Sequence, residues 1–284
     1  MTPARATLAG VGAILLWSAL APLTAATSGI PPFQVLALSF GIAFVLALAL
    51  WRARGESPLA QLRVPARAWL LGLYGLFGYH ALYFAALKTA PPVEANLINY
   101  LWPLLIVLLA GLLPGERLRP RHVLGAAAGL AGTAVLLGDG VAFGAEHLLG
   151  YGLALGCALV WSSYSVLSRR LIAVPSSAIG GFCGGTALLA WPAHWAFESW
   201  VAPTAGQWLI LIALGAGPVG AAFYLWDVGM KRGAIQLLGT LAYAAPLIST
   251  VLLIATGQGT ADWRVALAGL LIVGGGFVAG RSKA

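Results

Sequence analysis

One apolar stretch, residues 92–113, carries side chains that can bind a small polar molecule without themselves being charged. Asn96, Tyr100 and Pro103 follow the spacing i, i+4, i+7, which places them on one face of a helix, and Asn99 lies beside them. Asn and Tyr both donate and accept hydrogen bonds, so this face could bind an amino group and a carboxylate. The alternative is that these side chains only hydrogen-bond neighbouring helices to one another.

Aromatic residues in other apolar stretches suit the wall of a cavity. Tyr79 and Tyr83 lie one helical turn apart with His80 between them. Contacts between aromatic rings contribute about 0.5–1.5 kcal/mol beyond the burial of their area. Ordinary packing is the alternative for each residue. The predicted lining comprises Trp17, Tyr79, His80, Tyr83, Asn96, Asn99, Tyr100, Trp161, Tyr164, Tyr224 and Tyr243.

The composition shows what kind of protein must position these residues. Of the 284 residues, 60% are hydrophobic and only 8% are charged, against roughly 25% charged in an ordinary soluble domain. So few charges cannot cover a soluble protein, which excludes a soluble globular enzyme and a disordered chain. The two cysteines, Cys157 and Cys183, lie far apart in apolar stretches and indicate neither a metal site nor a disulfide framework.

Ten apolar runs are long enough to cross a bilayer as helices, which takes about 20 residues each. They lie at about 6–26, 32–50, 68–87, 92–113, 122–138, 150–168, 175–197, 207–226, 233–256 and 263–280. We therefore expect an all-α integral membrane protein with ten transmembrane helices. Five tryptophans near the ends of runs are expected to anchor at the membrane–water interface, namely Trp51, Trp69, Trp200, Trp208 and Trp263.

The basic residues between these runs predict the orientation. They alternate along the chain: the odd-numbered loops carry only Lys88 and Arg264, and the tails and even-numbered loops carry the rest of the 16 Lys and Arg. Since cytoplasmic loops are rich in Lys and Arg, we expect both termini in the cytoplasm. The net charge of +8 then reflects topology, the expected partner is the lipid bilayer, and no nucleic acid is expected.

The chain also contains an internal repeat. Lys88, Tyr100 and Pro103 recur, in the same order and 143 residues later, as Lys231, Tyr243 and Pro246. The repeat divides the chain into residues 1–143 and 144–284, with five predicted helices in each half. An odd number of helices inverts the second half relative to the first. Inverted repeats are a transporter architecture, with a substrate site near the membrane midplane and alternating access to its two sides.

The motifs of the first half resemble an EamA repeat, which defines a branch of the drug/metabolite transporter superfamily. They are Ala85-Ala86-Leu87-Lys88-Thr89-Ala90-Pro91, Tyr100-Leu101-Trp102-Pro103-Leu104, Gly115-Glu116-Arg117-Leu118, Gly125 and Gly132. The resemblance covers nearly the whole chain and is greatest to the bacterial aromatic amino-acid exporters of that branch. It implies export of Phe, Trp and Tyr across the bacterial inner membrane, with Thr, Met and cationic drugs as further candidates.

The sequence also bears on the mechanism. Pro103 and Pro246 remove backbone hydrogen bonds inside helices, which suits either paired hinges or static kinks. The chain has no GxxxxGK[ST] loop for ATP, and no carboxylate lies at a predicted midplane, so we expect facilitated, downhill movement. His80 is the candidate for a proton carrier if transport is proton-coupled, and a lining residue otherwise.

One further interpretation, a different substrate, stays open, and a second, a membrane-embedded enzyme, is excluded by the residues present. A transporter of the same fold could carry lipophilic cations, which bind aromatic rings, or nucleosides, and could be proton-coupled. A membrane-embedded enzyme would need a buried cluster of His, Asp, Glu or a metal, and the sequence offers none. We therefore expect no enzyme activity, no metal and no cofactor, and a small-molecule substrate. Ten helices can enclose a cavity within one chain, so a monomer is sufficient.

Overall fold

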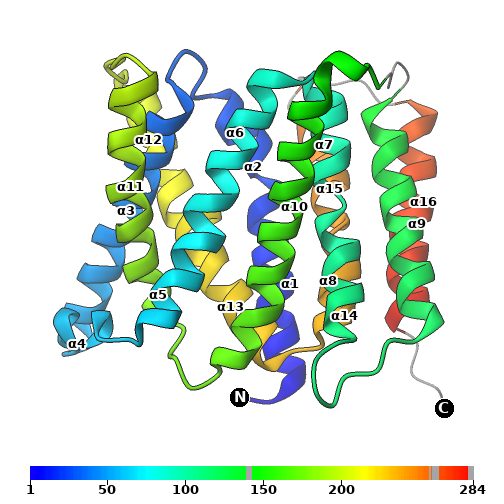
Figure 1. Ribbon diagram of the computed structural model, residues 1–284, viewed down its shortest axis with the longest axis horizontal. Helices are drawn as coiled ribbons and strands as arrows, with labels where there is room; N and C mark the ends of the chain where they lie inside the picture. Colours follow the sequence, from blue (N-terminus) through cyan, green and yellow to red (C-terminus); the bar gives the residue numbers. More distant parts are fainter. Residues whose placement is uncertain (139–142, 256, 258–261, 281–284) are drawn as a thin grey trace.

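The protein is a bundle of helices, as the composition predicts. The computed structural model describes residues 1–138, 143–255, 257 and 262–280. All regular structure in these residues is helical, and the helices stand side by side along one direction (Figure 1). The first turn of α1 (Pro3–Ser18) and the last turn of α16 (Trp263–Gly280) lie at the same end of the bundle. Arg281 and Lys283 of the predicted cytoplasmic tail lie outside the described residues.

Each half of the chain contains ten helical segments within its described residues, several of them short or π-helical. In the first half they are α1, α2 (Leu20–Ala25), α3 (Pro32–Ala53), α4 (Pro58–Leu62), α5 (Ala66–Leu73), η1 (Tyr74–Gly78), α6 (Tyr79–Thr89), α7 (Pro92–Asn99), α8 (Trp102–Ala110) and α9 (Pro120–Leu137). In the second half they are η2 (Ala145–His147), α10 (Leu148–Ser168), η3 (Arg169–Leu171), α11 (Ala178–Phe197), α12 (Ala205–Leu214), η4 (Gly215–Ala221), α13 (Ala222–Arg232), α14 (Ile235–Leu241), α15 (Ala244–Ala255) and α16.

Eight helical stretches among the described residues are long and apolar enough to cross a membrane. They are Pro3–Ala25, Pro32–Ala53, Ala66–Thr89, Pro92–Ala110, Ala145–Leu171, Ala205–Arg232, Ile235–Ala255 and Trp263–Gly280. The other two predicted runs, 122–138 and 175–197, coincide with the helices α9 and α11 but are not among the eight. The chain is thus a multi-pass membrane protein.

Two of the stretches break inside the bundle at positions related by the repeat. α7 gives way to α8 at Tyr100 and Leu101, and α14 gives way to α15 at Ala242 and Tyr243. Each break lies just before a proline, Pro103 or Pro246. Because proline has no N–H and its ring crowds the carbonyl four residues earlier, these are the places where the sequence predicts a kink.

A second pair of irregularities is absent from the sequence-based prediction. η1 and η4 are π-helical segments within the third and eighth predicted runs. Shifted by the repeat offset of 143, η1 falls on residues 217–221, inside η4. Glycines in both segments and Pro218 in η4 were the available signal. π segments loosen the regular ladder of backbone hydrogen bonds and often occur at functional sites.

The two halves pack together through pairs of helices, one from each half. The pairs are α1 with α13, α3 with α11, α6 with α10, and α9 with α16. In the last pair a Cβ on Gly125 would lie 2.5 Å from the backbone oxygen of Gly275, so the two backbones meet only because both residues lack a side chain. The main core consequently contains residues of both halves.

The predicted interface anchors differ in their surroundings. Trp200, Trp208 and Trp263 are exposed, as an anchor at the membrane surface requires. Trp51 is only 2% exposed, and its ring lies against Gly180 of α11. The prediction for Trp51 was wrong, because a neighbouring glycine makes room for the indole inside the bundle.

Candidate functional site

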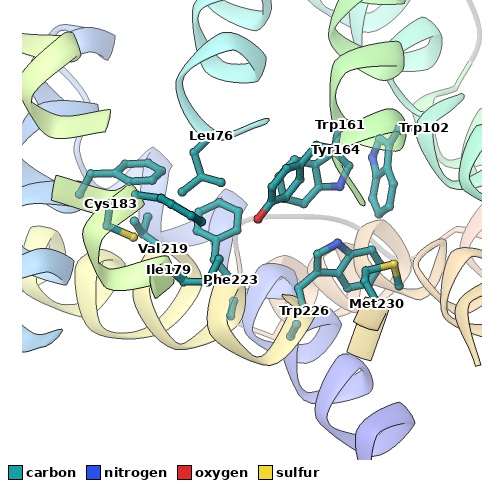
Figure 2. Close-up of a cluster of buried hydrophobic side chains, with 14 of the residues drawn as sticks. Leu76, Trp102, Trp161, Tyr164, Ile179, Cys183, Val219, Phe223, Trp226 and Met230 are labelled. Carbon is teal, nitrogen blue, oxygen red and sulfur yellow. The ribbon is translucent and has the colours of Figure 1, made fainter. Parts of the chain in front are cut away.

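The tryptophan Trp161 of α10 is the centre of an aromatic cluster between the two halves (Figure 2). Its ring centroid is 5.6 Å from Trp17, 5.4 Å from Tyr79, 5.2 Å from Tyr164 and 5.6 Å from Phe223. Trp17 belongs to the first half and Trp161 to the second, so their contact joins the two halves. The predicted aromatic residues of helices far apart in the sequence therefore meet.

Two more tryptophans close one side of this cluster. The ring of Trp102 lies 6.4 Å from Trp161 and 6.0 Å from Trp226, and both are buried. Figure 2 shows the three indoles grouped together. The indole of Trp226 donates a hydrogen bond to the Ser165 hydroxyl at 3.0 Å. Sequence reasoning left Trp102 out of the lining, although it stands beside Pro103 in the motif Tyr100–Leu104.

The predicted polar face of α7 meets the tyrosine pair of α6. The Tyr83 hydroxyl donates to Asn96 Oδ1 at 2.6 Å, and Asn99 Nδ2 donates to the Tyr79 hydroxyl at 3.1 Å. The two tyrosine rings are nearly parallel, with centroids 6.0 Å apart. Tyr79, Tyr83 and Asn96 are half-buried. Asn96 Nδ2 donates to the Pro92 carbonyl at 2.8 Å, whereas the buried Asn99 Oδ1 has no hydrogen-bond partner among the described residues.

His80 lies among aromatic rings and caps a backbone carbonyl of η1. Its Nδ1 is 2.6 Å from the carbonyl oxygen of Leu76, which can only accept, so Nδ1 carries the proton. The ring makes edge contacts with Phe40 at 5.3 Å and Tyr79 at 5.1 Å. In this tautomer the second nitrogen, Nε2, is an acceptor.

Trp17 hydrogen-bonds a backbone carbonyl of η4, as His80 does for η1. The indole Nε1 donates to the carbonyl oxygen of Pro218 at 3.0 Å. The two π segments, which lie at related positions of the two repeats, each have a carbonyl bonded by an aromatic N–H from the cluster. The cluster therefore stabilises irregular backbone as well as packing against itself.

The hydroxyl of Tyr243 occupies the break between α7 and α8. It accepts a hydrogen bond from the backbone N–H of Leu104 at 3.2 Å and donates one to the carbonyl of Tyr100 at 3.0 Å. In a continuous α-helix that N–H would donate directly to that carbonyl. The hydroxyl is thus inserted into the ladder of the opposite repeat. Tyr243 is 0% exposed, so its role here is to hold helix ends together.

The remaining candidates differ in accessibility. Tyr164 and Asn99 are buried behind the cluster, and a Cβ on Gly75 would lie 2.2 Å from the Tyr164 ring. Tyr100 is half-buried and Trp17 likewise. Tyr224 is 42% exposed and lies outside the group of rings around Trp161. Ring contacts and side-chain hydrogen bonds thus connect eight of the eleven predicted lining residues, namely Trp17, Tyr79, His80, Tyr83, Asn96, Asn99, Trp161 and Tyr164. Tyr243 meets Tyr100 at its backbone carbonyl and packs in a separate core cluster, and Tyr224 lies apart.

Charged side chains form two ion pairs at the end of the bundle that holds the first turn of α1, and one of these pairs joins the two halves. Glu116 of the first half pairs with Arg169 of the second half at 2.9 Å, and Arg169 also donates to the Gly233 carbonyl at 3.0 Å. Lys231 pairs with Asp227 at 2.8 Å and donates to the Val174 carbonyl at 2.9 Å. In the described residues no group of three His, Cys, Asp or Glu could hold a metal ion.

Comparison with known proteins identifies the family of the chain. Residues 4–138 and 148–281 each match the model of the EamA-like transporter family. The chain is 53% identical, over 98% of both chains, to a protein of Ancylobacter novellus named aromatic amino acid exporter YddG. It is 26% identical to proteins of the same name from Salmonella typhimurium and Escherichia coli, over 89% of this chain and 88% of each of theirs. One crystal structure superposes with a TM-score of 0.94 at 53% identity, covering 97% of each chain.

Removing the Tyr243 hydroxyl should destabilise the protein. In Tyr243→Phe the Leu104 N–H and the Tyr100 carbonyl lose their shared partner in an apolar interior, at an expected cost of about 1–3 kcal/mol. The measurement is the midpoint of thermal unfolding of the purified protein in detergent, followed by tryptophan fluorescence. Tyr74→Phe is the matched control, because the Tyr74 hydroxyl bonds Ser163 at an exposed position. Equal midpoints for wild type and Tyr243→Phe would show that the α7–α8 junction is stable without the hydroxyl.

Proposed function

The chain belongs to the EamA-like transporter family, and from this premise we propose that it exports phenylalanine, tryptophan and tyrosine from the cytoplasm. The observation that carries the proposal is the aromatic cluster around Trp161 beside the amides of Asn96 and Asn99. A relative 53% identical over nearly the whole chain is named an aromatic amino acid exporter. Threonine and methionine are the further amino-acid candidates.

The proposed topology is ten spans arranged as two inverted repeats, residues 1–143 and 144–284, in the bacterial inner membrane. The helices α9 and α11, of 18 and 20 residues, complete the ten. Inversion is supported by α1 and α10, which begin the two repeats and run in opposite directions (Figure 1). The distribution of Lys and Arg places both termini in the cytoplasm. One chain contains the whole cluster, so a monomer suffices.

Each part of the site has a proposed role in binding. The rings of Tyr79, Trp161 and Trp17 contact the aromatic side chain of the substrate edge-on or with an offset. The amides of Asn96 and Asn99 and the hydroxyl of Tyr83 bind its amino group and carboxylate. These contacts replace the present hydrogen bonds of Tyr83 to Asn96 and of Asn99 to Tyr79. Because the substrate is a zwitterion, the site needs no fixed counter-charge. The relatives are named as exporters, and we propose no enzyme activity.

A second candidate substrate is a lipophilic cation. Several ring faces around Trp161 suit a cation, which is attracted to the face of an aromatic ring by about 0.5–2 kcal/mol. This candidate keeps the fold and the site and changes only the ligand. The two candidates are therefore distinguished by which ligand competes for transport.

We predict that aromatic amino acids compete for transport. In proteoliposomes containing the purified protein, an excess of unlabelled Phe, Trp or Tyr should reduce uptake of labelled phenylalanine, and lysine and glutamate should not, because the site carries no counter-charge. Replacing Trp161 by Leu should weaken competition about tenfold, which corresponds to the loss of one or two ring contacts.

The control variant is Trp200→Leu, since Trp200 is exposed and lies at a helix end away from Trp161. Competition by tetraphenylphosphonium but by none of the three aromatic amino acids would replace the amino-acid proposal with the cation proposal. If neither aromatic amino acids nor tetraphenylphosphonium were transported, both proposed substrates would be wrong, and the family assignment would still hold.

Alternating access is the proposed mechanism, with the broken stretches α7–α8 and α14–α15 as the moving elements. The pairs Glu116–Arg169 and Lys231–Asp227, with their backbone bonds, hold the proposed cytoplasmic end of this conformation closed. Opening that end requires α8 and α14 to move against α7 and α15. The breaks before Pro103 and Pro246 are the proposed hinges, because fewer backbone hydrogen bonds resist bending there.

The hinge is tested by restoring a backbone N–H at its position. Pro103→Ala should lower the turnover rate severalfold and change the apparent affinity for phenylalanine little, because the substrate side chains are untouched while bending becomes harder. Steady-state uptake at varied phenylalanine concentrations measures both. An affinity loss equal to the rate loss would instead place Pro103 in the binding site. Pro22→Ala, in α2, is the control.

Transport is proposed to be downhill, without a coupled proton. Asp227 and Glu116, the acids described above, lie at the proposed cytoplasmic end and are paired with cations. His80, the candidate proton carrier, contacts aromatic rings and a carbonyl. A half-buried neutral His among aromatic rings suits a lining role, since charging it there would need a partner.

A pH gradient by itself should therefore drive no accumulation of phenylalanine in proteoliposomes. Counterflow of labelled against unlabelled phenylalanine should proceed at equal rates with and without the gradient. Accumulation that follows the gradient and disappears in His80→Ala, with counterflow retained, would establish proton coupling through His80 and contradict the downhill mechanism.

A further inference from the structure

An apolar groove lies on the outer surface of the bundle, away from the aromatic cluster. It runs between α3 and α11, is bordered by α4, α5 and α12, and has a volume of about 770 Å³. Leu38 and Val45 of α3 and Leu188 of α11 line it, and Val45 is 61% exposed. These helices form one edge of the bundle (Figure 1). The groove thus opens toward the lipid and not toward the substrate site.

The proposed cytoplasmic end of the groove is formed by residues 52–69, which run from the last turn of α3 through α4 to the first turn of α5. These residues are called the α3–α5 segment. Leu62 and Trp69 line the groove there, and a Cβ on Gly181, near the start of α11, would lie 2.7 Å from Leu62. The Trp69 indole donates to the Leu62 carbonyl at 3.2 Å, and Gln61 bonds Ser177. Contacts with α5 and with the residues at the start of α11 therefore hold this segment at the end of the groove.

This segment carries a dense positive charge. Arg52, Arg54, Arg63 and Arg67 are all exposed, and Arg63 directly follows the groove residue Leu62. Among the residues that the structure describes, no salt bridge involves any of the four. Glu56, the acid in the same segment, accepts a hydrogen bond from Gln61 at 3.0 Å. The arginines are thus available to an external anion.

We propose that this groove is a specific site for an anionic phospholipid of the cytoplasmic leaflet. An acyl chain fills the groove between α3 and α11, and the phosphate is bound by the arginines of the α3–α5 segment. Basic pockets at the cytoplasmic ends of membrane helices bind such headgroups, because the charge of the phosphate is only partly screened there. The proposal rests on the proposed orientation of the chain and is independent of the substrate.

Charge and shape together favour a lipid over a second copy of the chain. A copy would bring its own exposed arginines against these, and like charges directly opposed destabilise an interface. A neutral lipid would fill the groove but leave the arginines without a partner. An anionic phospholipid satisfies the apolar groove and the basic segment at once.

The test measures lipid retention on the intact purified protein. Wild-type protein in a mild detergent is titrated with palmitoyl-oleoyl phosphatidylglycerol or phosphatidylcholine, and bound lipid is counted by native mass spectrometry. The wild type should retain phosphatidylglycerol preferentially. The double variant Arg63→Gln/Arg67→Gln should bind it about 30-fold more weakly, since each surface arginine contributes about fivefold. Arg117→Gln/Arg170→Gln, which removes two exposed arginines elsewhere on the same face, is the matched control and should bind as the wild type does.

The groove itself is tested with a bulky residue. Val45→Trp should reduce retention of phosphatidylglycerol, whereas Val273→Trp, at an exposed position of α16 on the far edge of the bundle, should not. Equal retention of the two lipids by the wild type, or full retention by the arginine variant, would overturn the proposal. A dimer of the wild type in lipid nanodiscs that Val45→Trp converts to monomer would assign the groove to a second copy instead. If Val45→Trp does not fold, the arginine pair and its control decide alone. Loss of lipid selectivity with normal phenylalanine competition, or the reverse, separates this proposal from the proposed function.

Discussion

Inside a bilayer, a backbone N–H or C=O that leaves the helical ladder has no water to bond with, so the protein must supply a partner. This bundle interrupts its helices at the π segments η1 and η4 and at the break between α7 and α8. Side chains of the interior bond backbone groups at all three places: His80 at η1, Trp17 at η4 and Tyr243 at the break. At the break, losing the Tyr243 hydroxyl would leave the Leu104 N–H and the Tyr100 carbonyl unpaired, at a cost of about 1–3 kcal/mol.

The same constraint places the site and the irregular backbone together. Trp17 and His80 are members of the aromatic cluster around Trp161 as well as partners of the π segments. Tyr243 joins a helix of the second half to the backbone of the first. A ligand that displaces one of these rings therefore changes the support of a helix, which is a physical route from binding to movement in the proposed mechanism.

Several features of this arrangement could be predicted from the sequence because they depend on local chemistry. Apolar runs, the alternation of basic residues and the recurrence of Lys88, Tyr100 and Pro103 at one offset require no knowledge of neighbours. The sequence also predicted that Asn96 and Tyr83 both line the interior, because helical spacing places each on an inward face, and the two side chains are hydrogen-bonded. Trp51 was misassigned because its position near the end of a run indicated an anchor, whereas Gly180 on another helix makes a pocket for it.

The sequence by itself determined a helical membrane protein built from a repeat, rich in interior aromatic residues and belonging by its motifs to a transporter family. Only the tertiary structure decided which aromatics are open and which are buried, that Tyr243 completes the ladder of another helix, and that a lipid-facing groove ends at the arginines of the α3–α5 segment. The physical reason is the range of the interactions. Hydropathy and helical periodicity act within about 20 residues of chain, whereas a hydrogen bond such as that between Tyr243 and Tyr100 joins residues 143 positions apart.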